Sequence, residues 1–139
     1  MISTRGRYAL RVMIDIAENS GGNYITLNDI AKRQGISEKY LESILVLLTR
    51  GNLLSGLRGK GGGYKLTKDP GKYTVRSILL LSEGTLSPVA CLKDGAQPCL
   101  RQSECKTLPV WKGLNDVINE YLEGVTLADL IDKGDEYSI

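Results

Sequence analysis

The chain has 139 residues, of which 42% are hydrophobic and 24% are charged, with 18 basic and 16 acidic side chains. This composition excludes disordered and collagen-like proteins and suits one packed domain with an appendage. The chain contains no histidine, which rules out a Ser-His-Asp triad, a Cys-His pair and a His-ligated zinc. With no nucleotide-binding loop or paired-carboxylate motif either, we predict that the protein is not an enzyme.

Membrane insertion and secretion are not expected. The longest fully apolar run is residues 44–48, far shorter than the ~20 residues that a bilayer requires. Arg5, Arg7 and Arg11 interrupt the first apolar stretch, so no signal-peptide core is predicted. We therefore expect a cytoplasmic protein without a membrane partner. Its three cysteines, an odd number in a reducing compartment, favour metal or redox chemistry over a disulfide framework.

The basic residues are concentrated in the first half of the chain. Residues 1–73 hold 12 Lys and Arg against 6 Asp and Glu, a net charge of +6. Residues 74–139 hold 6 against 10, a net charge of −4. The first half would therefore attract a polyanion such as a nucleic acid.

Two helices are predicted at the start of the chain. Ser3 can cap a helix that runs to about Asn19, and Thr26 can cap a second one, with Asp29 at its capping-box position and Gly35 at its end. An extended piece at residues 24–25 separates them. The apolar face of the first helix is formed by Ala9, Val12, Met13, Ile16 and Ala17.

A third helix follows after a tight turn at residues 34–36. Ser37 caps it, and Gly51 closes it after Arg50. Two helices joined in this way are typical of a helix-turn-helix. The polar face of the third helix is either a DNA-reading surface or the solvated back of an ordinary amphipathic helix. The apolar face holds Leu41, Ile44, Leu45 and Leu48, and the polar face holds Lys39, Glu42, Ser43 and Arg50.

The next segment predicts a basic β-hairpin. Strands at residues 53–57 and 64–66 flank a glycine-rich tip that carries Arg58 and Lys60. A helix-turn-helix followed by such a hairpin is a winged helix, in which glycines let backbone amides approach phosphates and Arg58 can enter a minor groove. A nucleotide-binding P-loop is disfavoured, because this run lies between two strands and no Lys-Ser/Thr pair follows it.

A turn at residues 68–71 is the predicted boundary between a DNA-binding domain, residues 1–73, and a sensor and dimerisation region, residues 74–139. Thr74 can cap a helix through about Glu83, and Thr126 can cap a short last helix before a tail from Gly134.

Between those two helices, a long helix is predicted from Pro109. Its apolar residues recur at a 3-4-3-4 spacing, as in a coiled-coil seam. Such a seam can also pack on its own domain, but so small a chain offers little to cover it, and we predict a homodimer through residues 109–125. The seam consists of Trp111, Leu114, Ile118, Tyr121 and Val125.

All three cysteines, Cys91, Cys99 and Cys105, lie in one predicted loop at residues 84–107. Thiolates are soft ligands for zinc or iron–sulfur clusters. A Cys₄ zinc site lacks its fourth thiolate here. Three interpretations stay open: a cluster with one non-cysteine ligand, a disulfide switch without metal, and incidental surface thiols.

Several segments resemble the IscR-type winged-helix regulators. They are residues 3–10 (Ser-Thr-Arg-Gly-Arg-Tyr-Ala-Leu), Gly35-Ile36-Ser37 followed by Tyr40-Leu41-Glu42, Arg58-Gly59-x-Gly61-Gly62-Gly63-Tyr64, the cysteine loop, and the long helix ending in Gly124-Val125-Thr126-Leu127. The resemblance covers nearly the whole chain. It implies a mainly α fold with a small β-hairpin, in which a winged helix-turn-helix domain precedes a long C-terminal dimerisation helix. It also implies a bacterial homodimeric transcription factor that binds a double-stranded DNA operator.

The same resemblance implies site residues. Cys91, Cys99 and Cys105 match the ligands of an iron–sulfur cluster, for which we favour [2Fe–2S] over [4Fe–4S]. Glu42 falls where the family tunes its choice of operator, and Arg58 matches the wing residue that reaches the minor groove. The predicted DNA contacts are Ser37, Lys39, Tyr40, Glu42, Ser43, Arg58, Lys60, Gly61 and Gly62.

The fourth cluster ligand departs from the family pattern. One branch uses a histidine three residues after the last cysteine, where this chain has Leu108, and another uses a carboxylate where it has Arg7. Asp94, Ser103 or Glu104, a group from the other protomer, and an exogenous thiol remain as candidates. A related branch works without a cluster, so the alternative is a regulator controlled by a protein partner or a thiol redox switch.

Overall fold

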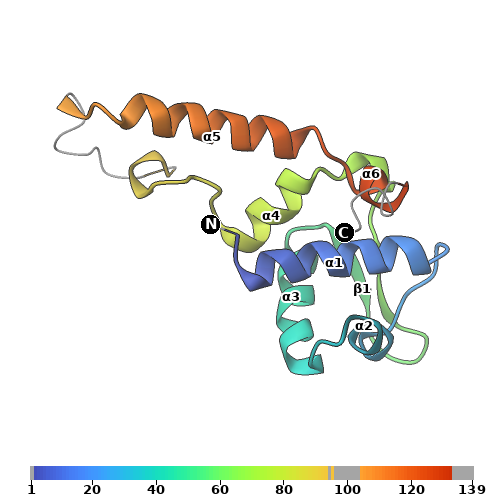
Figure 1. Cartoon of the computed structure of the whole chain (residues 1–139). Helices are drawn as coiled ribbons and strands as arrows, with labels where there is room; N and C mark the ends of the chain where they lie inside the picture. Colours follow the sequence, from blue (N-terminus) through green and yellow to red (C-terminus); the bar gives the residue numbers. More distant parts are fainter. Residues whose placement is uncertain (1, 94, 96–103, 133–139) are drawn as a thin grey trace.

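The computed structural model describes residues 2–93, 95 and 104–132, and it is mainly helical with one two-stranded antiparallel hairpin (Figure 1). This is the predicted fold class. In chain order the elements are α1 (Thr4–Asn19), α2 (Leu27–Gln34), α3 (Glu38–Arg50), β1 (Leu54–Leu57), β2 (Gly63–Leu66), the 3₁₀ turn η1 (Pro70–Lys72), α4 (Val75–Glu83), the 3₁₀ turn η2 (Ala90–Leu92), α5 (Leu108–Glu123) and α6 (Leu127–Asp132).

Hydroxyl side chains begin five of the helices at the predicted positions. Each accepts a hydrogen bond from a backbone N–H three residues later, which satisfies a donor that the first helical turn leaves free. Gly35 then closes α2 with a φ of 65°, a left-handed conformation that glycine adopts without strain. The capping pairs are Ser3 with Gly6, Thr26 with Asp29, Ser37 with Tyr40, Thr74 with Ser77 and Thr126 with Asp129.

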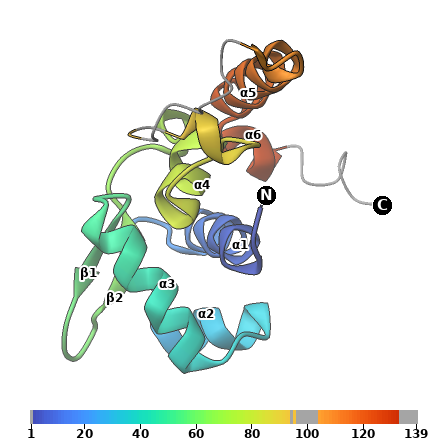
Figure 2. The ribbon, with the colours of Figure 1, turned by 90° about the vertical axis from the view of Figure 1, so that its left-hand side faces the viewer.

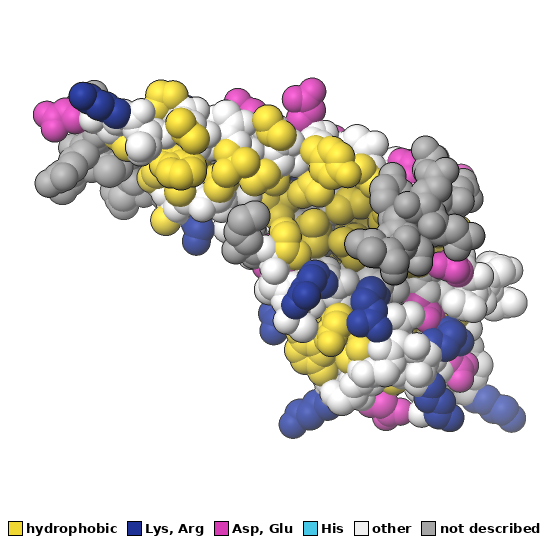
Figure 3. Space-filling view, viewed as in Figure 1, with side chains coloured by type: hydrophobic (Ala, Val, Ile, Leu, Met, Phe, Trp, Pro, Cys, Tyr) yellow, Lys and Arg dark blue, Asp and Glu magenta, His cyan; other side chains and the backbone are white. Residues whose placement is uncertain are grey.

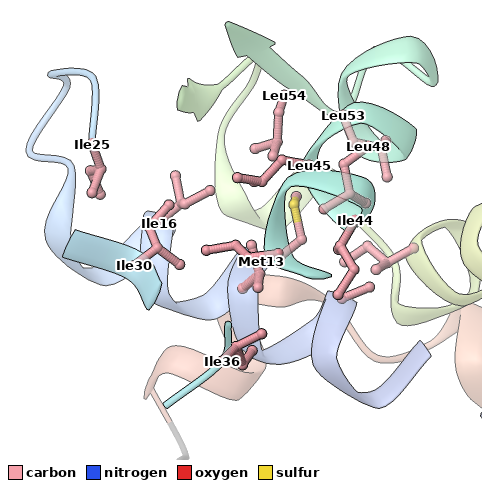
Figure 4. Packing of buried hydrophobic residues seen from close by; sticks show 14 of the residues in the cluster. Met13, Ile16, Ile25, Ile30, Ile36, Ile44, Leu45, Leu48, Leu53 and Leu54 are labelled. Carbon is pink, nitrogen blue, oxygen red and sulfur yellow. The ribbon is translucent and has the colours of Figure 1, made fainter. Parts of the chain in front are cut away.

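Helix α1 lies at the centre of the molecule and contacts α2, α3, β2, α4 and α6. Its buried face and that of α3 meet in one hydrophobic core (Figure 4). All four predicted apolar residues of α3 are buried there, which confirms that face, and in α1 only Ala17 of the predicted set stays half-buried. Since α1 contacts α4 and α6 directly, the core continues past residue 73, and the two-domain division stays a prediction.

The hairpin is closed by glycines in left-handed conformations. Leu57 pairs with Gly63 at its outer end, and the connecting tip includes Gly59 and Gly61 with φ of 91° and 77°. Next to this outer end, Tyr64 also forms an isolated antiparallel bridge with Ile25, which lies beside the hairpin. The hairpin, α2 and α3 lie at the end of the molecule opposite α5 (Figures 1 and 2).

Tyr73 connects the wing to the C-terminal elements. Its buried hydroxyl donates to the Leu53 carbonyl at 2.8 Å and accepts from the Thr67 N–H at 2.8 Å. Its own carbonyl accepts from the Leu127 N–H at 2.9 Å, at the start of α6. The base of the hairpin and the C-terminal helices are therefore held by the same residue.

Helix α5 begins one residue before the predicted Pro109 and projects past the rest of the fold (Figure 1). It has no buried residue. None of the helices in the described part of the chain is long and apolar enough to cross a membrane.

Candidate nucleic-acid interface and cysteine loop

The polar face of α3 is fully accessible. Lys39, Glu42, Ser43 and Arg50 are all exposed, as the helical periodicity predicts. Together with Arg5 they line an open depression of about 690 Å³, floored by side chains such as Val46 and Leu47. The outward face of α3 is thus a shallow, mostly basic surface rather than an enclosed pocket.

A second depression joins α3 to the wing. It has a volume of about 400 Å³, and both Arg50 and Arg58 line it. Because Arg50 borders both depressions, one continuous surface runs from α1 across α3 to the hairpin. Figure 3 shows Lys and Arg side chains over this end of the molecule and hydrophobic side chains along α5.

Ser37 and Tyr40 have structural partners on this surface. The Ser37 hydroxyl accepts from the Tyr40 N–H at 3.2 Å and so begins α3. The Tyr40 ring, half-buried, meets the Tyr8 ring edge-on at 5.9 Å, and the Arg11 guanidinium lies 5.0 Å over Tyr8. These contacts tie the start of α3 to α1, and a DNA-contacting role for both residues stays a prediction.

A buried carboxylate fixes the helix-turn-helix. Asp15 of α1 is 4% exposed and accepts hydrogen bonds from Arg33 at 2.7 and 2.9 Å and from the Gln34 side chain at 2.8 Å. Arg11 in turn donates to the Gln34 side chain at 3.0 Å and to its carbonyl. The hydrogen bond with Asp15 raises the pKa of Arg33. This network holds α2, and through the turn α3, at one angle to α1.

The wing tip is exposed and positively charged. Arg58 and Lys60 form no hydrogen bond or ion pair with any residue that the structure describes. Gly62 donates to the Gly59 carbonyl at 3.0 Å, and a side chain at Gly62 would collide with the Leu57 carbonyl. Glycine is therefore required where the tip folds back on itself, and the two cations are left free.

Two of the three cysteines lie in the described part of the loop. Cys91 is exposed in η2, and Cys105 is half-buried just before α5. The Cys105 sulfur lies 3.4 Å from the Thr107 hydroxyl, and this hydrogen bond, with backbone N–H groups at the start of α5, lowers the pKa of Cys105. A lowered pKa favours the thiolate, which is the form that binds metals and reacts with oxidants.

The full set of predicted ligands is not described. Cys99, Asp94 and Ser103 lie outside the described residues, whereas Glu104 is exposed beside Cys105. Within the described ranges, no three Cys, Asp or Glu side chains converge as a metal site would need. The donor chemistry of Cys91 and Cys105 suits soft metal ligation, and convergence of the three cysteines stays a prediction.

The predicted seam of α5 is split between two environments. Of the predicted seam, Ile118 and Val125 pack against α4 and the loop that follows it, together with Leu122, which is not part of the predicted seam. At about 100° of rotation per residue, Val117 and Tyr121 fall on the adjoining arc, which faces solvent with exposures of 62% and 64%. One side of the apolar arc is thus covered within the chain and the other is open. The open stripe consists of Val110, Leu114, Val117 and Tyr121.

A helix-turn-helix followed by a basic hairpin defines the class of winged-helix proteins. A family model described as Rrf2, iron-dependent transcriptional regulator, matches residues 2–133. The chain belongs to this family of transcriptional regulators. Its predicted likeness to the IscR-type regulators is confirmed by these matches and those below.

Relatives and solved structures agree with this membership. The HTH-type transcriptional regulator IscR of Citrobacter koseri is 35% identical over 132 residues, 95% of this chain and 80% of the relative. The structure of CymR, the global cysteine regulator of B. subtilis, matches with a TM-score of 0.76 and 34% identity over 95% of this chain and 96% of that one. The structure of IscR of T. potens matches with a TM-score of 0.76 and 30% identity, and the match covers 100% of this chain and 91% of that one. The relatives are named as regulators, so the chain is not an enzyme, as predicted.

Proposed function

We propose that the protein is a homodimeric regulator whose operator binding is controlled by an iron–sulfur cluster held in the loop at residues 91–105. The observation that carries the DNA-binding part is the continuous exposed basic surface from α3 to the wing, with Arg50 common to both depressions. A recognition helix of this kind lies in a major groove, and a wing reaches the flanking minor groove. Lys39, Glu42 and Ser43 then face the base edges, and Arg58 with Lys60, Gly61 and Gly62 faces the minor groove.

The role of Arg58 can be measured directly. Arg58→Ala is expected to weaken operator binding by about 1–3 kcal/mol, because it removes a base-reading contact. Binding is measured by fluorescence anisotropy on a duplex that the wild-type protein selects from a random pool. The control is Lys112→Ala, which removes the same charge from α5. An Arg58→Ala affinity equal to that of Lys112→Ala would contradict the assigned role.

The cysteine loop connects α4 to α5, the proposed dimerisation helix. It starts at Gly84, directly after α4, and ends at Thr107, where α5 begins. Cys91, Cys99 and Cys105 would hold the cluster, with the Cys105 thiolate favoured by its hydrogen bonds. The presence of an iron–sulfur cluster in this loop would depend on the supply of iron and on oxidants. Ligation would fix the three cysteines relative to one another beside the start of α5, and would thereby bias the distance between the two recognition helices of a dimer.

A cluster-free regulator is the second candidate. The solved relatives include CymR of Staphylococcus aureus in an oxidized form, with a TM-score of 0.74 and 29% identity over 95% of this chain and 96% of that one. The lowered pKa of Cys105 and the exposure of Cys91 suit a disulfide switch as well as they suit metal ligation. Control by a protein partner belongs to the same alternative.

Metal content separates the two candidates. We expect two irons and two acid-labile sulfides per chain after anaerobic purification, with visible absorption, and their loss in Cys99→Ala. Lys93→Ala, an exposed loop change that removes no thiol, is the control and should keep both. Four irons and four sulfides would assign a [4Fe–4S] cluster instead. A chain that stays colourless after reconstitution with iron and sulfide would reject the cluster, and mass analysis for a disulfide would then test the thiol switch.

A further inference from the structure

The first turn of α1 borders the DNA-facing surface. Arg5 lines the same depression as Lys39, Ser43 and Arg50 of α3, although it is more than 30 residues away from them in the chain. Its side chain is exposed. The sequence therefore brings a cation from outside the helix-turn-helix and the wing to the edge of the recognition helix.

The first turn of α1 is held in place by a residue 80 positions further along the chain. The Ser3 N–H and the Ser3 hydroxyl both donate to Glu83 at the end of α4, at 2.8 and 2.7 Å. Gly6 is buried beneath the same carboxylate, which occupies the space that a side chain at Gly6 would need. A helix end fixed in this way does not fray, so the Arg5 backbone has a defined position beside α3.

The Arg5 guanidinium is free, unlike its neighbours in α1. Arg7 donates to the Thr4 hydroxyl at 3.1 Å, and Arg11 is bonded to Gln34. The Arg5 side chain makes no hydrogen bond or ion pair with the described part of the chain. An unpaired guanidinium has a fork of donors that matches a phosphate, and contacts to phosphates position a protein on DNA without reading its sequence.

We propose that Arg5 binds a phosphate of the DNA backbone beside the groove entered by α3, so that α1 is a third DNA-contacting element besides the recognition helix and the wing. This proposal rests on the proposed function, because it requires that α3 faces DNA. In this role Arg5 increases the affinity for DNA and fixes the position of the protein on the duplex, but it does not contribute to sequence preference.

Arg5→Gln tests the proposal in the full-length chain. Binding is measured between 50 and 200 mM salt on two duplexes of equal length, one selected by the wild type from a random pool and one unrelated. We expect the affinity to fall about 5–20-fold on both duplexes alike. The slope of log K against log salt, which is negative, should become less steep by about 0.9, because one phosphate contact is lost. Because Arg5 has no partner within the described chain, the melting temperature should stay that of the wild type.

Arg7→Gln is the matched control. It removes the same charge two residues further along α1 from a side chain that does not line the depression, and it should change affinity less than about twofold with an unchanged slope. Equal affinities of the two variants would overturn the proposal. So would a loss confined to the selected duplex, since that would mark a base contact. A wild-type chain that selects no duplex from the random pool and does not bind the unrelated duplex would overturn the proposed function, and this inference with it.

Discussion

Val117→Glu is expected to raise the dissociation constant of the proposed homodimer at least about 100-fold. Val117 is 62% exposed at the middle of the open stripe of α5. A two-fold symmetric dimer through this stripe would bury both copies of the new carboxylate in an apolar interface. Each uncompensated buried charge costs several kcal/mol, which exceeds the 2.7 kcal/mol that a 100-fold change represents. Analytical ultracentrifugation across a concentration series measures the change, and operator affinity should fall with it.

Lys112→Glu is the matched control for this prediction. Lys112 lies about 140° around α5 from Val117, on the polar side of the helix, and is likewise exposed. Installing a glutamate there should leave the dimer intact. If Val117→Glu and Lys112→Glu dimerise equally well, the interface does not include the open stripe.

Arg33→Ala is expected to lower the free energy of unfolding by about 3 kcal/mol. The Asp15 side chain is only 2% exposed, and Arg33 supplies two of its three side-chain hydrogen bonds. Removing the guanidinium leaves a buried carboxylate without its counter-charge, a loss that typically costs 3–5 kcal/mol. Because the Gln34 side chain still donates a hydrogen bond to the Asp15 carboxylate, the expected cost lies at the lower end of this range. Urea unfolding followed by circular dichroism measures it.

Substitutions of Asp15, the partner of Arg33, and of Lys32, its neighbour in the chain, provide the controls. Asp15→Asn leaves Arg33, whose side chain is 38% exposed and reaches water, so it should cost less than Arg33→Ala. Lys32→Ala, one residue earlier and exposed, should stay within about 0.5 kcal/mol of the wild type. An Arg33→Ala protein as stable as Lys32→Ala would show that the network does not anchor the helix-turn-helix.

The local features of this fold could be predicted from the sequence because their causes are local. A hydroxyl at Ser37 or Thr74 is within reach of the N–H groups that it caps, so the helix starts follow from a few adjacent residues. The 3.6-residue period placed Leu41 and Leu48 in the core and left Lys39 on the surface. The tip of the wing follows in the same way from its run of glycines.

The long-range features could not be predicted in this way. Nothing near Asp15 in the chain marks it as buried, because its partner Arg33 is 18 residues away. Ser3 meets Glu83 across 80 residues. Periodicity located the apolar arc of α5 but not what covers it, since Ile118 packs on α4 while Tyr121 faces solvent. Each of these depends on how helices pack, which a single sequence does not specify.

In the proposed function, the state of the cysteine loop controls DNA binding. The most direct test compares the operator affinity of one protein preparation before and after anaerobic removal of its iron, on the duplex selected by the wild type. Allosteric coupling of ordinary size predicts that the two affinities differ by about 5–150-fold. Affinities that agree within twofold would contradict the claim, and the winged helix would then bind DNA independently of the cluster.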